Sequence, residues 1–127
     1  MNYVHGIDII DVSRIEAMLE KHGDHFIERC FTEAEQEAAE VSSTQTRSQR
    51  FAARYAAKEA VLKALGTGLS GGIEWIEIGV VRDSGSPTIV LTGKAQEVAL
   101  KAGINQWRLS LSHTQSIAIA SVIGFGE

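Results

Sequence analysis

The sequence predicts an α+β fold, a small and mainly antiparallel sheet packed against one long central helix. Residues 51–65 are rich in alanine and carry larger apolar residues at helical spacing, while period-two alternation recurs near both ends of the chain. The segments follow the order strand, helices, hairpin, helix, hairpin, and this partial segregation favours α+β over alternating βαβ units. The length of 127 residues fits a single domain over residues 1–127.

The boundaries of the elements follow from alternation, capping signals and glycines. The expected strands are residues 2–10, 73–81, 88–92, 106–113 and 115–123. The expected helices are residues 11–23, 24–31, an acidic helix that starts at a capping box of Thr32 and Glu35, a central helix from 47 or 48 to 65, and 93–102. The polar run 41–49 reads as a surface loop, and Gly66 is expected to end the central helix in the left-handed conformation.

The composition narrows the classes of function. The chain is 44% hydrophobic and 22% charged with a net charge of −4, so we expect a globular protein whose main partner is not nucleic acid. Cys30 is the only cysteine and lies among apolar residues, which favours a buried structural thiol over a nucleophile. The start has no basic leader, and no apolar run approaches the ~20 residues of a membrane span. We therefore expect a cytoplasmic protein.

The first strand and the central helix carry charged residues that could support chemistry. Asp8 lies inside an apolar strand, where it must cap the next helix, pair with an arginine or bind a cation, because unpaired buried charge is costly. Arg54, Lys58 and Glu59 are expected on one charged side of the helix, and Glu59 and Lys63 have the spacing of a surface ion pair. Asp8, Glu59 and Lys63 beside a glycine loop would also suit a magnesium-assisted reaction on a phosphate ester. Both interpretations are open at this point.

Two weaker signals lie close to turns. The segment Gly66-Thr67-Gly68 is either a helix stop or a loop whose backbone approaches a phosphate. His113 lies where a strand meets a turn, so it is either a structural histidine or a ligand for an anion.

Four motifs occur together in the chain: GIDIIDVSRIE, FIERCFTEAE, RYAAKEAVLKALGTG and LSLSHTQSIAIASV. In order and spacing they resemble the holo-acyl-carrier-protein synthases, the short bacterial type of the 4′-phosphopantetheinyl transferase superfamily, over nearly the whole chain. The resemblance implies that the serine hydroxyl of an apo acyl carrier protein attacks the β-phosphate of coenzyme A. The serine would take up 4′-phosphopantetheine, and adenosine 3′,5′-bisphosphate would leave.

The resemblance also implies roles for individual residues. Asp8 and Glu59 match the magnesium ligands of the family, and Lys63 matches a residue that acts on the pyrophosphate or in proton removal. Glu59, directly or through a water, is the favoured base, with Lys63 as the alternative. The expected coenzyme A contacts are Arg54, Gly66, Thr67, Gly68 and His113.

Partners follow from the same resemblance. Members of the family form homotrimers with active sites between subunits, and their first helix docks on the acidic helix of the carrier protein. Arg14, Met18 and Lys21 match the docking face, although Glu16 and Glu20 make the helix less basic here, so we expect salt-sensitive docking. The competing hypotheses are a module that binds coenzyme A or a nucleotide without turnover, and a purely structural oligomer subunit.

Overall fold

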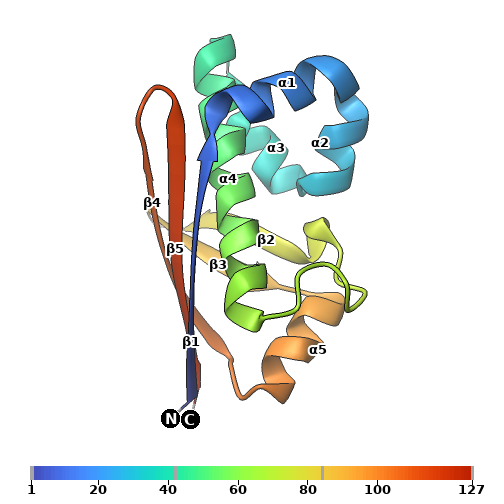
Figure 1. Cartoon of the computed structure of the whole chain (residues 1–127), viewed down its shortest axis with the longest axis vertical. Coiled ribbons are helices and arrows are strands. Elements are labelled where there is room, and N and C mark those ends of the chain that lie inside the picture. Colours follow the sequence, from blue (N-terminus) through green and yellow to red (C-terminus); the bar gives the residue numbers. More distant parts are fainter. Residues whose placement is uncertain (1, 42, 84, 127) are drawn as a thin grey trace.

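The structure, a computed structural model, describes residues 2–41, 43–83 and 85–126. Its strands are β1 (Asn2–Asp11), β2 (Ile78–Asp83), β3 (Ser86–Leu91), β4 (Gln106–His113) and β5 (Ile117–Gly126). Its helices are α1 (Val12–His22), α2 (Asp24–Cys30), α3 (Glu33–Ala39), α4 (Thr44–Leu65) and α5 (Gly93–Lys101), with a short 3-10 helix η1 (Trp75–Glu77) before β2. Figure 1 shows the predicted α+β architecture, which is thereby confirmed.

The strands form two antiparallel sheets. The larger has the order β1-β5-β4, and the smaller is the β2-β3 hairpin. In the larger sheet Asp8 pairs with Ala120, which pairs in turn with Leu111 on β4. The predicted alternation of β1 is confirmed, because Gly6 and Ile10 are buried while Ile7 and Ile9 are exposed.

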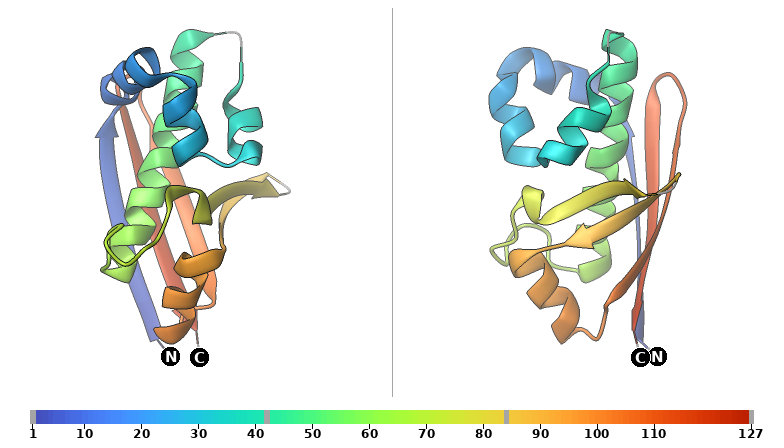
Figure 2. Two further views of the ribbon diagram at one scale, coloured as in Figure 1. Left: turned by 90° about the vertical axis from the view of Figure 1, so that its right-hand side faces the viewer. Right: turned by 180° about the vertical axis from the view of Figure 1, so that it is seen from behind.

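Helix α4 lies along the inner face of the larger sheet, and the other helices and the small sheet cover its far side (Figures 1 and 2). The helix is buried on nearly all sides, and its alanines allow close approach: Ala52, Ala56, Ala57 and Ala60 are fully buried. The opposite face of the larger sheet is covered by no other element in the described part of the chain (Figure 2). The catalytic candidates on α4 are therefore held by a core that surrounds the helix.

The structure corrects two of the predicted elements and the expected position of one side chain. Helix α4 begins at Thr44, capped by the Ser43 hydroxyl, which accepts from Thr46 N at 3.3 Å, so most of the predicted loop 41–49 is helical; residue 42 lies outside the described residues. The predicted strand 73–81 begins only at Ile78, because Glu74 and Glu77 form a reciprocal capping box around η1. The polar residues in the first turns of α4 are typical of a loop, and the apolar residues of η1 are typical of a strand, which explains why both predictions were wrong.

The third correction concerns Lys58. It does not belong to a charged side of the helix with Glu59, because its side chain is fully buried against Glu35. Cys30 is buried as predicted, and this burial raises the pKa of its thiol. Within the described residues, no helix has the length and apolarity needed to cross a membrane.

Candidate active site

The site begins with a carboxylate on β1 and a lysine on α4. Lys63 Nζ donates to Asp8 Oδ1 at 2.8 Å and to Ile7 O at 3.2 Å. The Asp8 side chain is only 13% exposed and that of Lys63 55%, so the carboxylate is recessed beneath the lysine. The partner of Asp8 is thus neither the next helix nor an arginine, and Lys63 forms this pair in place of the predicted pair with Glu59. The hydrogen bond to Asp8 raises the pKa of Lys63 and keeps its ammonium charged.

Gly6 allows β1 to approach α4 closely enough for this pairing. A Cβ built at Gly6 would lie 1.9 Å from Ala60 O and 3.0 Å from Ala64 N. Gly6 is two residues from Asp8 on the same face of β1, and Ala60 directly follows Glu59. The backbone contact therefore fixes how far Asp8 lies from the functional face of α4.

Glu59 is the second carboxylate of this group. Its side chain is half-buried, one helical turn before Lys63. Burial raises the pKa of Glu59, the negative charge of Asp8 raises it further, and Arg14 and Lys63 act in the opposite direction. Two carboxylates that repel each other at the surface are an arrangement that a divalent cation would relieve.

The donor set fits magnesium. No group of three or more His, Cys, Asp or Glu side chains suited to holding a metal occurs among the residues that the structure describes. Asp8 and Glu59 are two carboxylates, fewer than such a group needs. Mg²⁺ commonly binds through one or two carboxylates while waters and substrate phosphates complete its shell. We call Asp8, Glu59 and Lys63 the acidic group.

The glycine loop follows the acidic group directly in the chain. Gly66 ends α4 in the left-handed conformation (φ 74°), and its N–H bonds to Leu62 O and Lys63 O. Gly68 also has a positive φ of 56°, and a Cβ at either glycine would meet nothing within 4 Å. The glycines are needed for their backbone conformation, and the exposed loop is open to a ligand.

A second group of charged residues forms a cationic pocket of about 510 Å³ between α4, β2 and β4. Arg54 and His113 both line it, so the structure brings together two residues that the sequence separates widely. Arg54 is 8% exposed and its Nε has no hydrogen-bond partner, while burial lowers its pKa. A buried guanidinium with a free N–H at a pocket wall is suited to an anion.

Sequence reasoning missed two arginines of the cationic pocket. Arg50 lies one helical turn before Arg54, and this spacing could have identified it. Arg82 comes from β2, and no local pattern links it to α4. The two additional guanidinium groups strengthen the anion-binding character of the pocket.

The acidic group and the cationic pocket lie on opposite flanks of α4. Asp8 is on β1 at one edge of the sheet and His113 is on β4 at the other, with β5 between them. Two strand spacings separate these edges by about 10 Å, and α4 covers the sheet between them. One chain therefore does not bring all predicted site residues into a single cleft.

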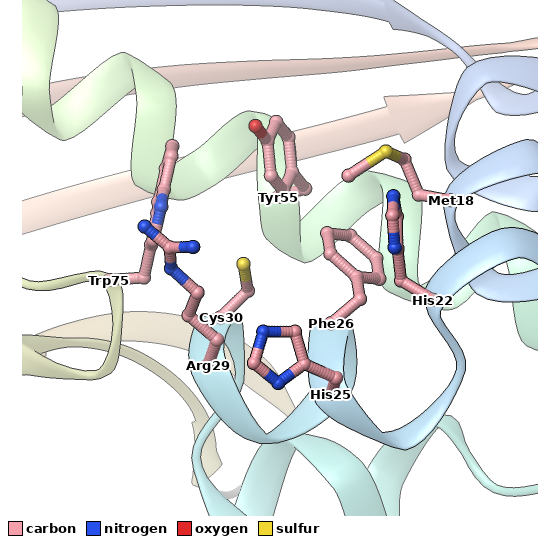
Figure 3. Close-up of a pocket in the computed structure, with 8 residues that line it drawn as sticks. All are labelled: Met18, His22, His25, Phe26, Arg29, Cys30, Tyr55 and Trp75. Atoms are coloured by element: carbon pink, nitrogen blue, oxygen red, sulfur yellow. The ribbon is translucent and has the colours of Figure 1, made fainter.

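One of the predicted docking residues, Met18, lines a third feature, an aromatic pocket of about 340 Å³ (Figure 3). Met18 lines the pocket, Arg14 lies 6.0 Å above the Tyr55 ring, and Lys21 is exposed farther along α1. The full lining of the aromatic pocket is Met18, His22, His25, Phe26, Arg29, Cys30, Tyr55 and Trp75. The sequence analysis missed His22, the last residue of α1, and His25 and Arg29, which lie on α2.

Comparisons with known proteins agree with this geometry. A family profile described as the 4′-phosphopantetheinyl transferase superfamily matches residues 5–120. The holo-[acyl-carrier-protein] synthase of Geotalea daltonii is 43% identical, with 97% of this chain and 98% of that protein covered.

Solved structures show the same fold. The holo-(acyl-carrier-protein) synthase of Bacillus anthracis, in complex with CoA (3′,5′-ADP), superposes with a TM-score of 0.79 at 34% identity over 98% of this chain and 96% of that chain. The Helicobacter pylori enzyme in complex with coenzyme A gives 0.81 at 28% identity, covering 94% and 98%. The chain therefore belongs to the 4′-phosphopantetheinyl transferase superfamily, and within it to the holo-[acyl-carrier-protein] synthases.

Proposed function

We propose that this protein transfers 4′-phosphopantetheine from coenzyme A to a serine of an apo acyl carrier protein. The observation that carries the proposal is the ion pair between Asp8 and Lys63, which come from distant motifs, with Glu59 one helical turn before Lys63. The name of the relatives and the coenzyme A complexes of two of them support the same reaction.

The reaction forms a bond between the serine Oγ and the β-phosphorus of coenzyme A. The bond from that phosphorus to the oxygen bridging to the α-phosphate breaks, and adenosine 3′,5′-bisphosphate leaves. The serine proton passes to Glu59, directly or through a water.

Asp8 and Glu59 would hold a magnesium ion, which would supply neutralising charge to the phosphates. Lys63 adds a positive charge of its own at the mouth of the site. We assign Lys63 as a cation for the pyrophosphate, with the role of base as its alternative.

Coenzyme A contacts are assigned to the glycine loop and the cationic pocket. The exposed backbone at Gly66, Thr67 and Gly68 suits a pyrophosphate, and Arg54 and His113 suit a further phosphate group. Since the acidic group and the cationic pocket lie on opposite flanks of α4, we propose that the ligand of one subunit also contacts the cationic pocket of its neighbour.

A homotrimer with active sites between subunits would satisfy this requirement. The uncovered face of the larger sheet carries exposed large apolar residues, which a second copy of the chain would bury. They are Tyr3, Ile7, Ile9, Ile119 and Ile123, between 36% and 74% exposed. The proposal requires that this interface bring one subunit's acidic group near the next subunit's cationic pocket.

The carrier protein is proposed to dock on α1. Arg14 and Lys21 are exposed cations suited to an acidic helix, and Met18 continues the surface into the aromatic pocket. A cytoplasmic site of action is part of the same proposal.

The test is a transfer assay with the full chain, coenzyme A, Mg²⁺ and an apo carrier protein, followed by the intact mass of the carrier. We expect the carrier to gain phosphopantetheine with the wild type and with Glu97→Gln, a surface carboxylate variant on α5, and to gain none with Glu59→Gln. Binding of coenzyme A without any mass gain would identify a binding module instead, and neither binding nor gain would leave a structural subunit.

A further inference from the structure

A buried ion pair joins α4 to the elements on its far side. The side chains of Lys58 and Glu35 are both 0% exposed, with Lys58 Nζ 2.7 Å from Glu35 Oε1. Lys58 also donates to Trp75 O at 3.1 Å and to Ile78 O. The ammonium thus uses its three donors on a carboxylate of α3 and on the carbonyls at both ends of η1.

Glu35 is equally well satisfied. It accepts from Thr32 N at 2.8 Å through Oε1 and from Val80 N at 2.8 Å through Oε2. The pair therefore ties α3, η1 and β2 to one point on α4. Apolar residues of similar volume can stabilise a core as well as a buried ion pair does, but they cannot bind two carbonyls. This argues for a role in positioning.

The element that Lys58 holds carries a wall of the aromatic pocket. The Trp75 ring stacks on Tyr55 with centroids 4.9 Å apart and planes inclined by 29°, and both rings line the pocket together with Met18 (Figure 3). The other side of η1 is held by Glu77, whose backbone and side chain accept from Thr92 N and Ala95 N. Glu77 thus links η1 to α5, and Lys58 sets the distance between η1 and α4.

We propose that Lys58, with Glu35 as its partner, is a positioning residue for the aromatic pocket. It fixes the Trp75 wall against Tyr55 and so shapes the surface next to α1. The inference rests on the proposed function for the use of that surface, which is to receive the carrier protein.

The experiment compares the wild type with Lys58→Met. If this variant does not fold, the double variant Lys58→Met with Glu35→Gln takes its place, because it removes both charges of the pair. A Trp107→Phe background leaves Trp75 as the sole tryptophan reporter. We expect the KM for the carrier protein to rise about tenfold, since small misplacements at a docking surface weaken productive binding strongly. The kcat and the KM for coenzyme A should stay within about threefold, and Trp75 emission should shift to longer wavelength.

Val122→Ala is the matched control, a fully buried residue of β5 on the sheet side of α4. It should lower the Tm and leave the carrier KM and Trp75 emission unchanged. A folded Lys58 variant with unchanged carrier KM and unchanged emission would overturn the proposal, as would equal losses in every kinetic constant. If the wild type did not transfer phosphopantetheine, only the proposed function would be refuted. The emission of Trp75 in the Lys58 variants would then show by itself whether Lys58 positions the Trp75 wall of the aromatic pocket.

Discussion

Gly6→Ala is expected to damage the site by separating β1 from α4. The new Cβ would lie 1.9 Å from Ala60 O, whereas real Cβ contacts below 3.0 Å essentially never occur. Ala60 is fully buried and cannot retreat, so the edge strand β1 must move outwards by about 1 Å. Asp8, two residues along the same face, moves with it away from Glu59 and Lys63.

The size of the effect follows from this displacement. Overpacking of this kind costs about 1–3 kcal/mol, which for a chain of this length lowers the Tm by roughly 4–12 °C. Misplacing a catalytic group by about 1 Å can cost on the order of a hundredfold in rate. Thermal unfolding and kcat for carrier modification measure the two effects separately.

Gly79→Ala provides the matched control. Gly79 is also a strand glycine, but its Cβ would meet Val90 O at 3.5 Å, an ordinary contact. This variant should keep near-normal activity and stability. If Gly6→Ala were as active and as stable as Gly79→Ala, the close approach of β1 and α4 would not hold the site together.

Three further variants probe separate parts of the site. Because the pKa of Glu59 is raised in the folded protein, its ionised form lowers the stability of the metal-free protein above that pKa. Glu59→Gln should therefore abolish most activity but raise the Tm of the metal-free protein near neutral pH by a few degrees. Thermal scans in the presence of a chelator should show no gain in Tm below about pH 4. Arg54→Ala should raise the KM for coenzyme A about tenfold or more, whereas an unchanged KM would remove the cationic pocket from the site. Replacing Arg14 and Lys21 together by alanine should raise the carrier KM and flatten its dependence on salt; a salt dependence equal to that of the wild type would exclude steering by these residues.

The sequence indicated the elements of the fold well where a local pattern determined them. The period-two faces of β1 and the capping box of Thr32 and Glu35 occur as predicted. The start of α4 was missed because its first turns are polar, and Ser43 looks like a loop residue until its hydroxyl is seen to cap the helix.

The candidate site was harder to predict because its contacts are not local. The spacing of Glu59 and Lys63 suggested a pair on one helix, but Lys63 bonds to Asp8, 55 residues away. Lys58 looks like its exposed neighbours in the sequence, and only the fold shows that it is enclosed with Glu35. That Asp8 and Arg54 lie on opposite flanks of α4 depends on strand order, which no motif encodes.

Subunit complementation tests most directly that the transferase site is shared between copies of the chain. At a coenzyme A concentration well below the wild-type KM, Glu59→Gln is expected to be nearly inactive and Arg54→Ala to keep about a tenth of the wild-type rate or less, because each removes one half of every site. Co-expression of the two in equal amounts would leave about one quarter of the sites with both residues intact, since one comes from each neighbour. The account predicts that the mixed oligomer adds phosphopantetheine to the carrier at about one quarter of the wild-type rate. A mixed preparation no more active than the two variants measured separately would contradict it.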